Sequence, residues 1–220
     1  MIRFLLASAL FLFASIVNAQ DVDQQNPYNM VKTVAENTFS RITKDKAIIE
    51  KDKDHLKTVV SEELLPYIDY RYAAQRVLGS YISKVRSIKD AEEKKAEIEN
   101  LKRFIEVFRE YLITSYAGIF TQYRGQEVEF APAQAVGNEK LVVVKTKIVE
   151  TGKPDIKIDF KVRKTKSGEW KGFDMLPEGI SLLDAKQAEF HGILRTEGLG
   201  YVIDMLEKKS KLPVQFAGDE

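Results

Sequence analysis

The fold is decided by residues 139–190, which read EKLVVVKTKIVETGKPDIKIDFKVRKTKSGEWKGFDMLPEGISLLDAKQAEF. Between residues 155 and 164, charged side chains alternate strictly with four apolar ones, Ile156, Ile158, Phe160 and Val162. A period of two is typical of a strand that is buried on one face only. The stretch therefore predicts a sheet with one face toward water and one apolar face. That apolar face covers either a core filled by the chain itself or a bound guest.

Three further strands are expected around this one. Residues 141–149 are rich in β-branched side chains, and TGKP at 151–154 supplies Gly and Pro where a hairpin would reverse. Residues 170–176 follow the turn signal SG at 167–168, and residues 127–130 offer a fourth, short strand. We expect an α+β fold, in which a curved four-stranded antiparallel sheet packs with several helices around an apolar pocket.

Six segments carry apolar side chains at helical spacing: 28–41, 55–65, 69–81, 90–123, 181–194 and 201–207. The fourth segment is longer than an ordinary globular helix, so we expect a break near Ala96 or Thr114. The sequence shows neither an internal repeat nor a clear linker. We expect one domain over residues 20–207 and a flexible, charged C-terminal tail over residues 208–220.

Residues 1–19 resemble a secretory signal peptide. Arg3 precedes an apolar run over residues 4–17, and the small Ala19 would lie before a cleavage site at Gln20. The run is too short to be a comfortable membrane span. We therefore expect cleavage before Gln20 and a mature protein outside the cytoplasm.

The composition excludes several classes of protein. The chain has no cysteine, which rules out disulfides, thiolate metal sites and lipid attachment through a cysteine. Loss of Arg3 with the leader would take the net charge from +1 to 0. A binder of nucleic acid needs a clear basic excess to neutralise phosphates, so we expect no nucleic-acid partner.

Candidate catalytic groups are sparse. His55 and His191 are far apart and have no carboxylate at a zinc-type spacing, so we expect no metal site. Ser181 lies in GISLL, which is not a nucleophile elbow, and a helix N-cap is the better interpretation. Asp174 lies among apolar residues of the last strand, where it would be either a base with a raised pKa or, as we favour, a structural acceptor. We expect no enzymatic activity and no cofactor.

Short motifs spread over nearly the whole mature chain support a more specific interpretation. In chain order they are LPY at 65–67, VLG at 77–79, FREYL at 108–112 followed by Tyr116, YRGQ at 123–126, WKGFDM at 170–175, EGIS at 178–181, KQAEF at 186–190 and LRTEG at 194–198. With these motifs in this order, the chain resembles the MlaC, or toluene-tolerance, family. It departs from the family pattern at residues 87–100, which are more charged and longer by roughly three helical turns.

The resemblance implies a periplasmic phospholipid carrier of the Mla pathway in Gram-negative bacteria. Such a carrier shuttles lipid between the outer-membrane Mla lipoprotein–porin complex and the inner-membrane Mla ABC transporter complex, and so maintains outer-membrane lipid asymmetry. The family fold is a curved sheet and helices that enclose a pocket for acyl chains. The expected cargo is phospholipid, and the expected oligomeric state is a monomer.

On this hypothesis, inward-facing apolar residues of the sheet and helices bind the acyl chains, and the phosphate head stays near water at the mouth. The predicted lipid-binding residues are Leu78, Phe104, Phe108, Leu112, Val144, Ile156, Ile158, Phe160, Val162, Phe173 and Met175. Two alternatives remain open at this point. One is a periplasmic protein-interaction module with a self-filled core and no lipid ligand, and the other is a hydrolase that uses Asp174.

Overall fold

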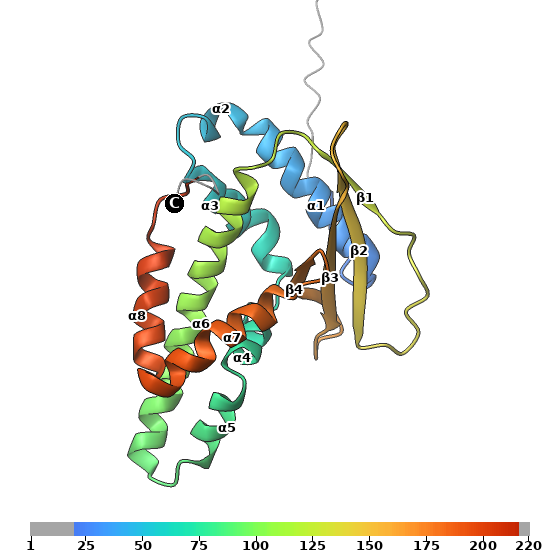
Figure 1. Ribbon diagram of the computed structural model, residues 1–220. Coiled ribbons are helices and arrows are strands. Elements are labelled where there is room, and N and C mark those ends of the chain that lie inside the picture. The colour runs from blue at the N-terminus through green and yellow to red at the C-terminus, as the bar shows by residue number, and fades with distance from the viewer. Residues whose placement is uncertain (1–19, 216–220) are drawn as a thin grey trace, which may run out of the picture.

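Four antiparallel strands form one sheet in the order β1-β2-β3-β4, as the sequence predicted (Figure 1). The computed structural model describes residues 20–215, so the predicted signal peptide at 1–19 lies outside the described residues. The strands are β1 (Glu127–Phe130), β2 (Leu141–Val149), β3 (Ile156–Lys164) and β4 (Trp170–Pro177). Each pairs with its neighbour in sequence, because the connections are hairpins or short loops.

The register brings apolar side chains of three strands onto one face. Val144 on β2 lies opposite Phe160 on β3, and Phe160 lies opposite Met175 on β4. The pairing of β3 with β4 shifts between Lys161 and Val162, which leaves Phe173 without a partner on β3. A bulge of this kind re-aims a side chain. It turns Phe173 toward the helices, where the ring packs with the main helical core.

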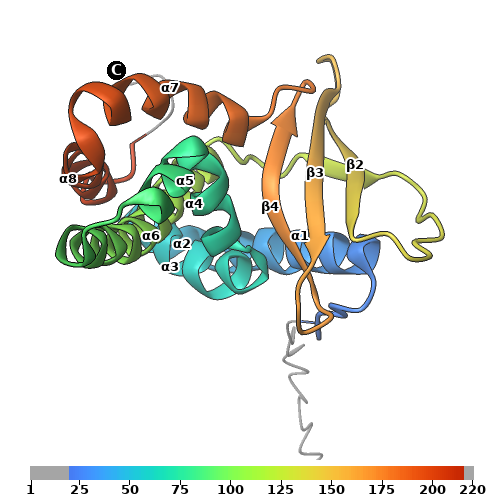
Figure 2. The ribbon, with the colours of Figure 1, turned by 90° about the horizontal axis from the view of Figure 1, so that it is seen from below.

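Helix α1 (Pro27–Lys44) lies along one face of the sheet (Figure 2). Asn26 caps it by accepting from the amides of the first turn, and proline occupies the first helical position. Met30 and Val34 point from α1 toward the sheet and bury three side chains, Val144, Val162 and Trp170. This part of the apolar sheet face is therefore covered by the chain itself.

The remaining helices lie beside the β4 edge of the sheet (Figure 2). They are α2 (Lys46–Ile49), α3 (His55–Val59), α4 (Tyr70–Leu78), α5 (Ser80–Ser87), α6 (Ala91–Phe120), α7 (Leu182–Thr196) and α8 (Gly198–Ser210), with a π-helical turn η1 (Val60–Leu64) and a 3-10 turn η2 (Leu65–Tyr67) between α3 and α4. Helices α4, α6, α7 and α8 share one core, in which Phe104 and Phe190 are fully buried. Within the described residues the apolar side chains form three clusters: one between α1 and the sheet, one among α4, α6, α7 and α8, and one around α3 and η1 that includes Leu56, Val59 and Ile113.

The break expected near Ala96 or Thr114 is wrong, because α6 is a continuous helix of 30 residues. Asp90 caps its first turn by accepting from the amide of Glu93 at 2.8 Å. The Glu- and Lys-rich half has high helix propensity, and the first glycine is Gly118, near the end. The second half buries its apolar face against the other helices, so both halves favour one helix.

The C-terminal segment packs more closely than its composition suggested. Helix α8 ends at Ser210, past the expected domain boundary at 207. Lys57 Nζ donates to the carbonyl of Leu212 at 2.7 Å, and the amide of Val214 donates to Asp54 Oδ1 at 2.7 Å. These contacts hold the described part of the tail against α3. Among residues 20–215, no helix is both long and apolar enough to cross a membrane.

Candidate functional site

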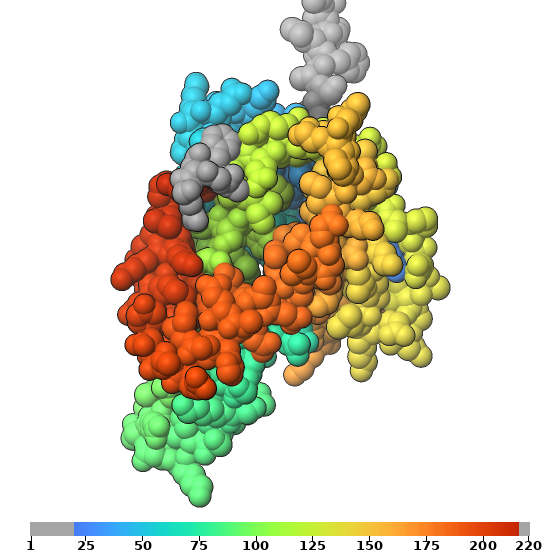
Figure 3. Space-filling view, viewed as in Figure 1, coloured from blue at the N-terminus to red at the C-terminus, as the bar shows by residue number. Residues whose placement is uncertain are grey.

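An apolar cavity of about 100 Å³ lies where α4, α6 and α7 meet β4. Its walls come from distant parts of the chain and include Phe108, Leu112, Ile119, Phe173, Met175 and Leu183. The molecular surface is hollowed between α6 and the neighbouring strands (Figure 3). The lining also contains a few polar groups, from Tyr111, Ser115, Tyr116, Asp174 and Lys186. An apolar cavity with few polar groups is the usual form of a small-molecule site.

Four of the predicted lipid-binding residues line this cavity: Phe108, Leu112, Phe173 and Met175. Phe104 instead lies in the helical core, fully buried, with its ring stacked on Phe108 at 5.6 Å between centroids. Leu78 lines a different cavity, between α5 and α6. On α6, one turn of helix thus separates Phe108, at the cavity wall, from Phe104, in a filled core.

The predicted sheet residues divide into three groups. Val144 and Val162 are buried under α1 and line neither cavity. Phe160 and Ile158 are half-buried, and Phe160 is the cross-strand neighbour of Met175, so they continue the apolar face beyond the cavity. Ile156 is 48% exposed near the β2–β3 turn. A role of these residues in lipid binding stays a prediction.

Asp174 is the most buried carboxylate at the site, with a side chain 1% exposed. It accepts from Lys161 Nζ at 2.9 Å, from the Ser181 hydroxyl at 2.7 Å and from the amide of Leu183 at 3.0 Å. Ser181 in turn accepts from the amide of Asp184 at 3.0 Å, which confirms the predicted N-cap. These contacts make Asp174 the structural link between β4 and the start of α7.

Tyr116 and Lys186 carry the polar character of the cavity. Burial and the nearby Asp174 carboxylate raise the pKa of Tyr116 to about 12, so its phenol is neutral at physiological pH. Burial lowers the pKa of Lys186, but its hydrogen bonds to Glu189 and Tyr111 outweigh this effect and raise it. The Lys186 ammonium also lies 5.4 Å from the centre of the Tyr111 ring. The Lys186 ammonium, which is paired with Glu189, therefore lies at the α7 side of the cavity.

Sequence reasoning missed the polar lining residues, above all Lys186, Tyr111 and Ser115. The predicted lining consisted of apolar side chains alone. Tyr111, Ser115 and Ile119 have helical spacing on α6 and continue the face of Phe108. This spacing could have indicated that they line the cavity. Lys186 begins the KQAEF motif at 186–190, but that motif does not indicate a pocket position, which depends on how α7 packs.

Of the two histidines, His55 is engaged in structure. His55 Nε2 lies 2.8 Å from Asp45 Oδ2, and Asp45 also accepts from Arg41, so this cluster joins α1 to α3. Within residues 20–215, no three His, Asp or Glu side chains are close enough together to hold a metal ion. The site is thus a cavity with positioned polar groups.

Fold and site together define a class of α+β binding proteins, in which helices and a curved sheet surround an apolar cavity. Residues 32–208 match the family described as "MlaC protein", and the chain belongs to this family. The resemblance carried by the sequence motifs is thereby confirmed.

A curated protein and a solved structure are similar to this chain. The chain is 30% identical over 207 residues to the "Intermembrane phospholipid transport system binding protein MlaC" of Haemophilus influenzae, covering 93% of this chain and 92% of that protein. It also resembles a solved phospholipid-binding protein from Ralstonia solanacearum in complex with a phospholipid, with a TM-score of 0.69 and 21% identity over 84% of this chain and 97% of the other. The second likeness shows a shared fold.

Proposed function

We propose that this protein carries phospholipid across the periplasm, between an outer-membrane and an inner-membrane Mla complex, and so maintains outer-membrane lipid asymmetry. The observation that supports this most strongly is the apolar cavity between α6, α7 and β4, in a chain of the MlaC family. The names of both relatives include phospholipid binding or transport. Export through cleavage before Gln20 and a monomeric state belong to the same proposal.

Energetics explain why such a protein is needed. Each methylene exposed to water costs about 0.8 kcal/mol, so two acyl chains with some 30 methylenes cost on the order of 25 kcal/mol. Unaided passage through water is prohibitive at that cost. Moving the chains from a bilayer into an apolar cavity is nearly neutral, because one apolar environment replaces another. A carrier can therefore both accept and release lipid without chemistry.

The cavity must widen to take a diacyl lipid. An engineered cavity of about 150 Å³ in another protein holds one benzene molecule, so about 100 Å³ accepts roughly four carbon atoms. Two acyl chains are several times larger. We propose that α6 and α7 move away from the sheet on loading, and that Phe160 and Ile158, on the same face as Met175, then join the lining.

The polar groups suit a carrier. The Asp174 carboxylate is occupied by three donors, so it is poorly placed to act as a base on a substrate. Lys186 supplies a positive charge beside the cavity, where a lipid phosphate would remain near water. We therefore propose binding and release without catalysis, with phospholipid as cargo and no cofactor.

The direct test is to identify what the protein binds. The full chain would be purified from the periplasm without detergent, extracted with organic solvent and analysed by mass spectrometry. We expect about one phospholipid per protein, and recovery of a mixture of head groups, because the walls contact mainly the tails. Recovery of no phospholipid from fresh material would overturn the proposal and favour an interaction module with a self-filled core.

A further inference from the structure

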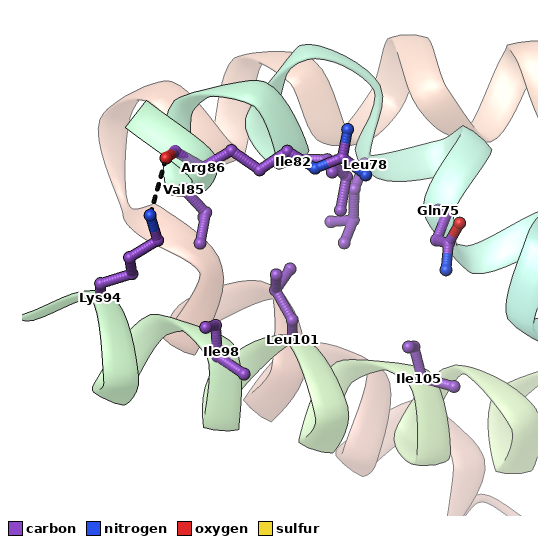
Figure 4. A pocket seen from close by; sticks show the side chains of 9 residues that line it. All are labelled: Gln75, Leu78, Ile82, Val85, Arg86, Lys94, Ile98, Leu101 and Ile105. Atoms are coloured by element: carbon purple, nitrogen blue, oxygen red, sulfur yellow. Dashed lines mark hydrogen bonds between the residues drawn. The ribbon is translucent and has the colours of Figure 1, made fainter. Parts of the chain in front are cut away.

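A second cavity, of about 290 Å³, lies between α5 and the N-terminal half of α6 (Figure 4). Leu78, Ile82 and Val85 form one wall, and Ile98, Leu101 and Ile105 form the other. Figure 4 shows the two sets facing each other across an open space. Apart from Leu78, these residues have no part in the proposed phospholipid site. Ile98 is 40% exposed, which leaves apolar surface uncovered at this end of α6.

Two cations border the apolar walls. Lys94 Nζ donates to the backbone carbonyl of Arg86 at 3.0 Å, which holds the two residues together. The Arg86 side chain extends along α5 toward Leu78 (Figure 4). In the described part of the chain, its guanidinium forms no ion pair, and the cavity lining includes no carboxylate. Glu97, the nearby carboxylate on α6, accepts from the Tyr81 hydroxyl at 3.0 Å.

The size of the cavity matches one acyl chain. If about 150 Å³ holds the six carbons of benzene, then 290 Å³ holds about a dozen carbon atoms. Its α6 wall runs from Lys94 to Ile105, which is about 16 Å at the helical rise of 1.5 Å per residue. A long, narrow space of this volume accepts a single chain and excludes the two tails of a phospholipid.

We propose that this cavity binds a single-chain anionic amphiphile of about a dozen carbons. The chain lies between the α5 and α6 walls and covers Ile98, and the anionic head meets the Arg86 guanidinium, while Lys94 adds a second positive charge at the border of the cavity. Arg86 suits this role because a guanidinium donates in a fork that matches a carboxylate or a phosphate. A fatty acid and a lysophospholipid share this chemistry. The site is separate from the one proposed for phospholipid, and its test does not depend on that function.

The test is isothermal titration of the full chain with sodium laurate below its micellar concentration. We expect one laurate to bind per protein. Ile98→Glu places a negative charge in the mouth on an exposed helical position and should weaken binding at least about tenfold. The matched control is Ile48→Glu, at an apolar position on α2 that is 50% exposed and remote from both cavities, which should bind as the unmodified chain does. Equal binding by both variants would overturn the proposal.

Further titrations identify the head group. Arg86→Gln combined with Lys94→Gln should weaken laurate about tenfold or more, because both cations are lost. Dodecyltrimethylammonium, with the same chain and a positive head, should bind at least about tenfold more weakly than laurate. Comparison of laurate with 12-carbon lysophosphatidylglycerol shows which anionic source binds better. The assignment would be overturned if neither laurate nor the lysophosphatidylglycerol bound, or if dodecyltrimethylammonium bound as tightly as laurate.

A competition separates the two sites. Protein loaded with phospholipid from vesicles should still bind laurate, and a photoreactive laurate should attach to peptides that contain residues 78–105. Displacement of laurate by phospholipid would overturn the second site, because the cavity would then be one end of the first. Failure to load phospholipid would contradict the proposed function, while laurate binding would still support this inference.

Discussion

The Ser181 hydroxyl donates to Asp174 Oδ2 at 2.7 Å, and this hydrogen bond joins the last strand of the sheet to the first turn of α7. Asp174 also pairs with Lys161 on β3, so one buried carboxylate holds three elements together. The same two elements, β4 and α7, form two walls of the first cavity. Asp174 could fix the cavity wall or react with a substrate. These two roles lead to different expected effects of a mutation.

Asp174→Asn should lower stability without abolishing any turnover. The amide keeps the shape of the carboxylate but leaves Lys161 without its ion pair, which we expect to cost about 1–3 kcal/mol in urea unfolding. The lower part of that range is favoured, because the Lys161 side chain is 26% exposed and can be rehydrated. Phospholipid content should fall only as far as folding does. Asp184→Asn, at an exposed position in the first turn of α7, should change stability by about 0.5 kcal/mol. A folded Asp174→Asn protein that lost a measurable hydrolysis would support the hydrolase instead.

Ser115→Trp should fill the first cavity and reduce phospholipid binding. Ser115 lies on α6 at the cavity wall, so the indole would occupy the space that the acyl chains need. If displacing the indole costs about 1–3 kcal/mol, as overpacking does, the affinity falls by about five- to 150-fold. Transfer of a fluorescent phospholipid from vesicles measures the effect. Lys102→Trp places the same ring on the exposed face of α6 and should transfer lipid normally. Normal transfer by Ser115→Trp would show that the lipid binds elsewhere.

Tyr116 predicts how stability depends on pH in the alkaline range. Its pKa is about 12 in the folded protein and about 10 in an unfolded chain. Because the folded pKa is the higher one, the contribution is fully present below pH 10 and is lost as the pH rises through 12. The free energy of unfolding should therefore decline by up to about 2 kcal/mol between pH 10 and pH 12, and Tyr116→Phe should remove this decline. Urea unfolding across this pH range measures it. An unchanged decline would contradict the burial of this phenol.

Tyr81 offers an independent check of the same effect. Burial, together with the hydrogen bond to Glu97, raises its pKa to about 12. It lies on α5, and Tyr116 lies in the C-terminal half of α6, so the effects of the two substitutions should add. The Tyr81→Phe, Tyr116→Phe double variant should therefore show the smallest alkaline decline of the three proteins.

The strands could be predicted because their signal is local. Alternation between residues 155 and 164 depends only on neighbours in sequence, and so does the hairpin signal at 151–154. What covers an apolar sheet face is not local. Val162 and Phe160 have the same period, yet Val162 is buried under α1 and Phe160 is only half-buried. Their difference depends on where α1 lies, which the alternation does not encode.

The direction of Phe173, the continuity of α6 and the position of Lys186 depend on more than the apolar spacing. Phe173 points to the helices because a bulge in β4 changes its direction, and a bulge leaves no mark on the apolar spacing. The break expected in α6 relied on typical helix lengths, whereas propensity and the absence of glycine before Gly118 favour a continuous helix. Lys186 lies at the site because of how α7 packs against α4 and β4.

Gly79→Ala should destabilise the junction between α4 and α5 by two separable effects. Gly79 has φ +51° and ψ −123°, a conformation that is strained for any residue with a Cβ and costs about 1–3 kcal/mol. An added Cβ would also lie about 2.3 Å from Nε2 of Gln187, the group that donates to the carbonyl of Arg76 at 2.9 Å. Urea unfolding should therefore show a cost near the upper end of that range.

A double-mutant cycle with Gln187→Ala separates the strain from the clash. Gln187→Ala alone removes one exposed hydrogen bond and should cost about 0.5–1 kcal/mol. In that background the Cβ meets no side chain, so Gly79→Ala should cost about 1 kcal/mol less than in the unmodified chain, and the remainder measures backbone strain. Equal costs in both backgrounds would mean that Gln187 moves aside freely.

Because Leu78 and Ile82 flank this glycine and line the second cavity, Gly79→Ala should also weaken laurate binding, whereas Gln187→Ala should leave it unchanged.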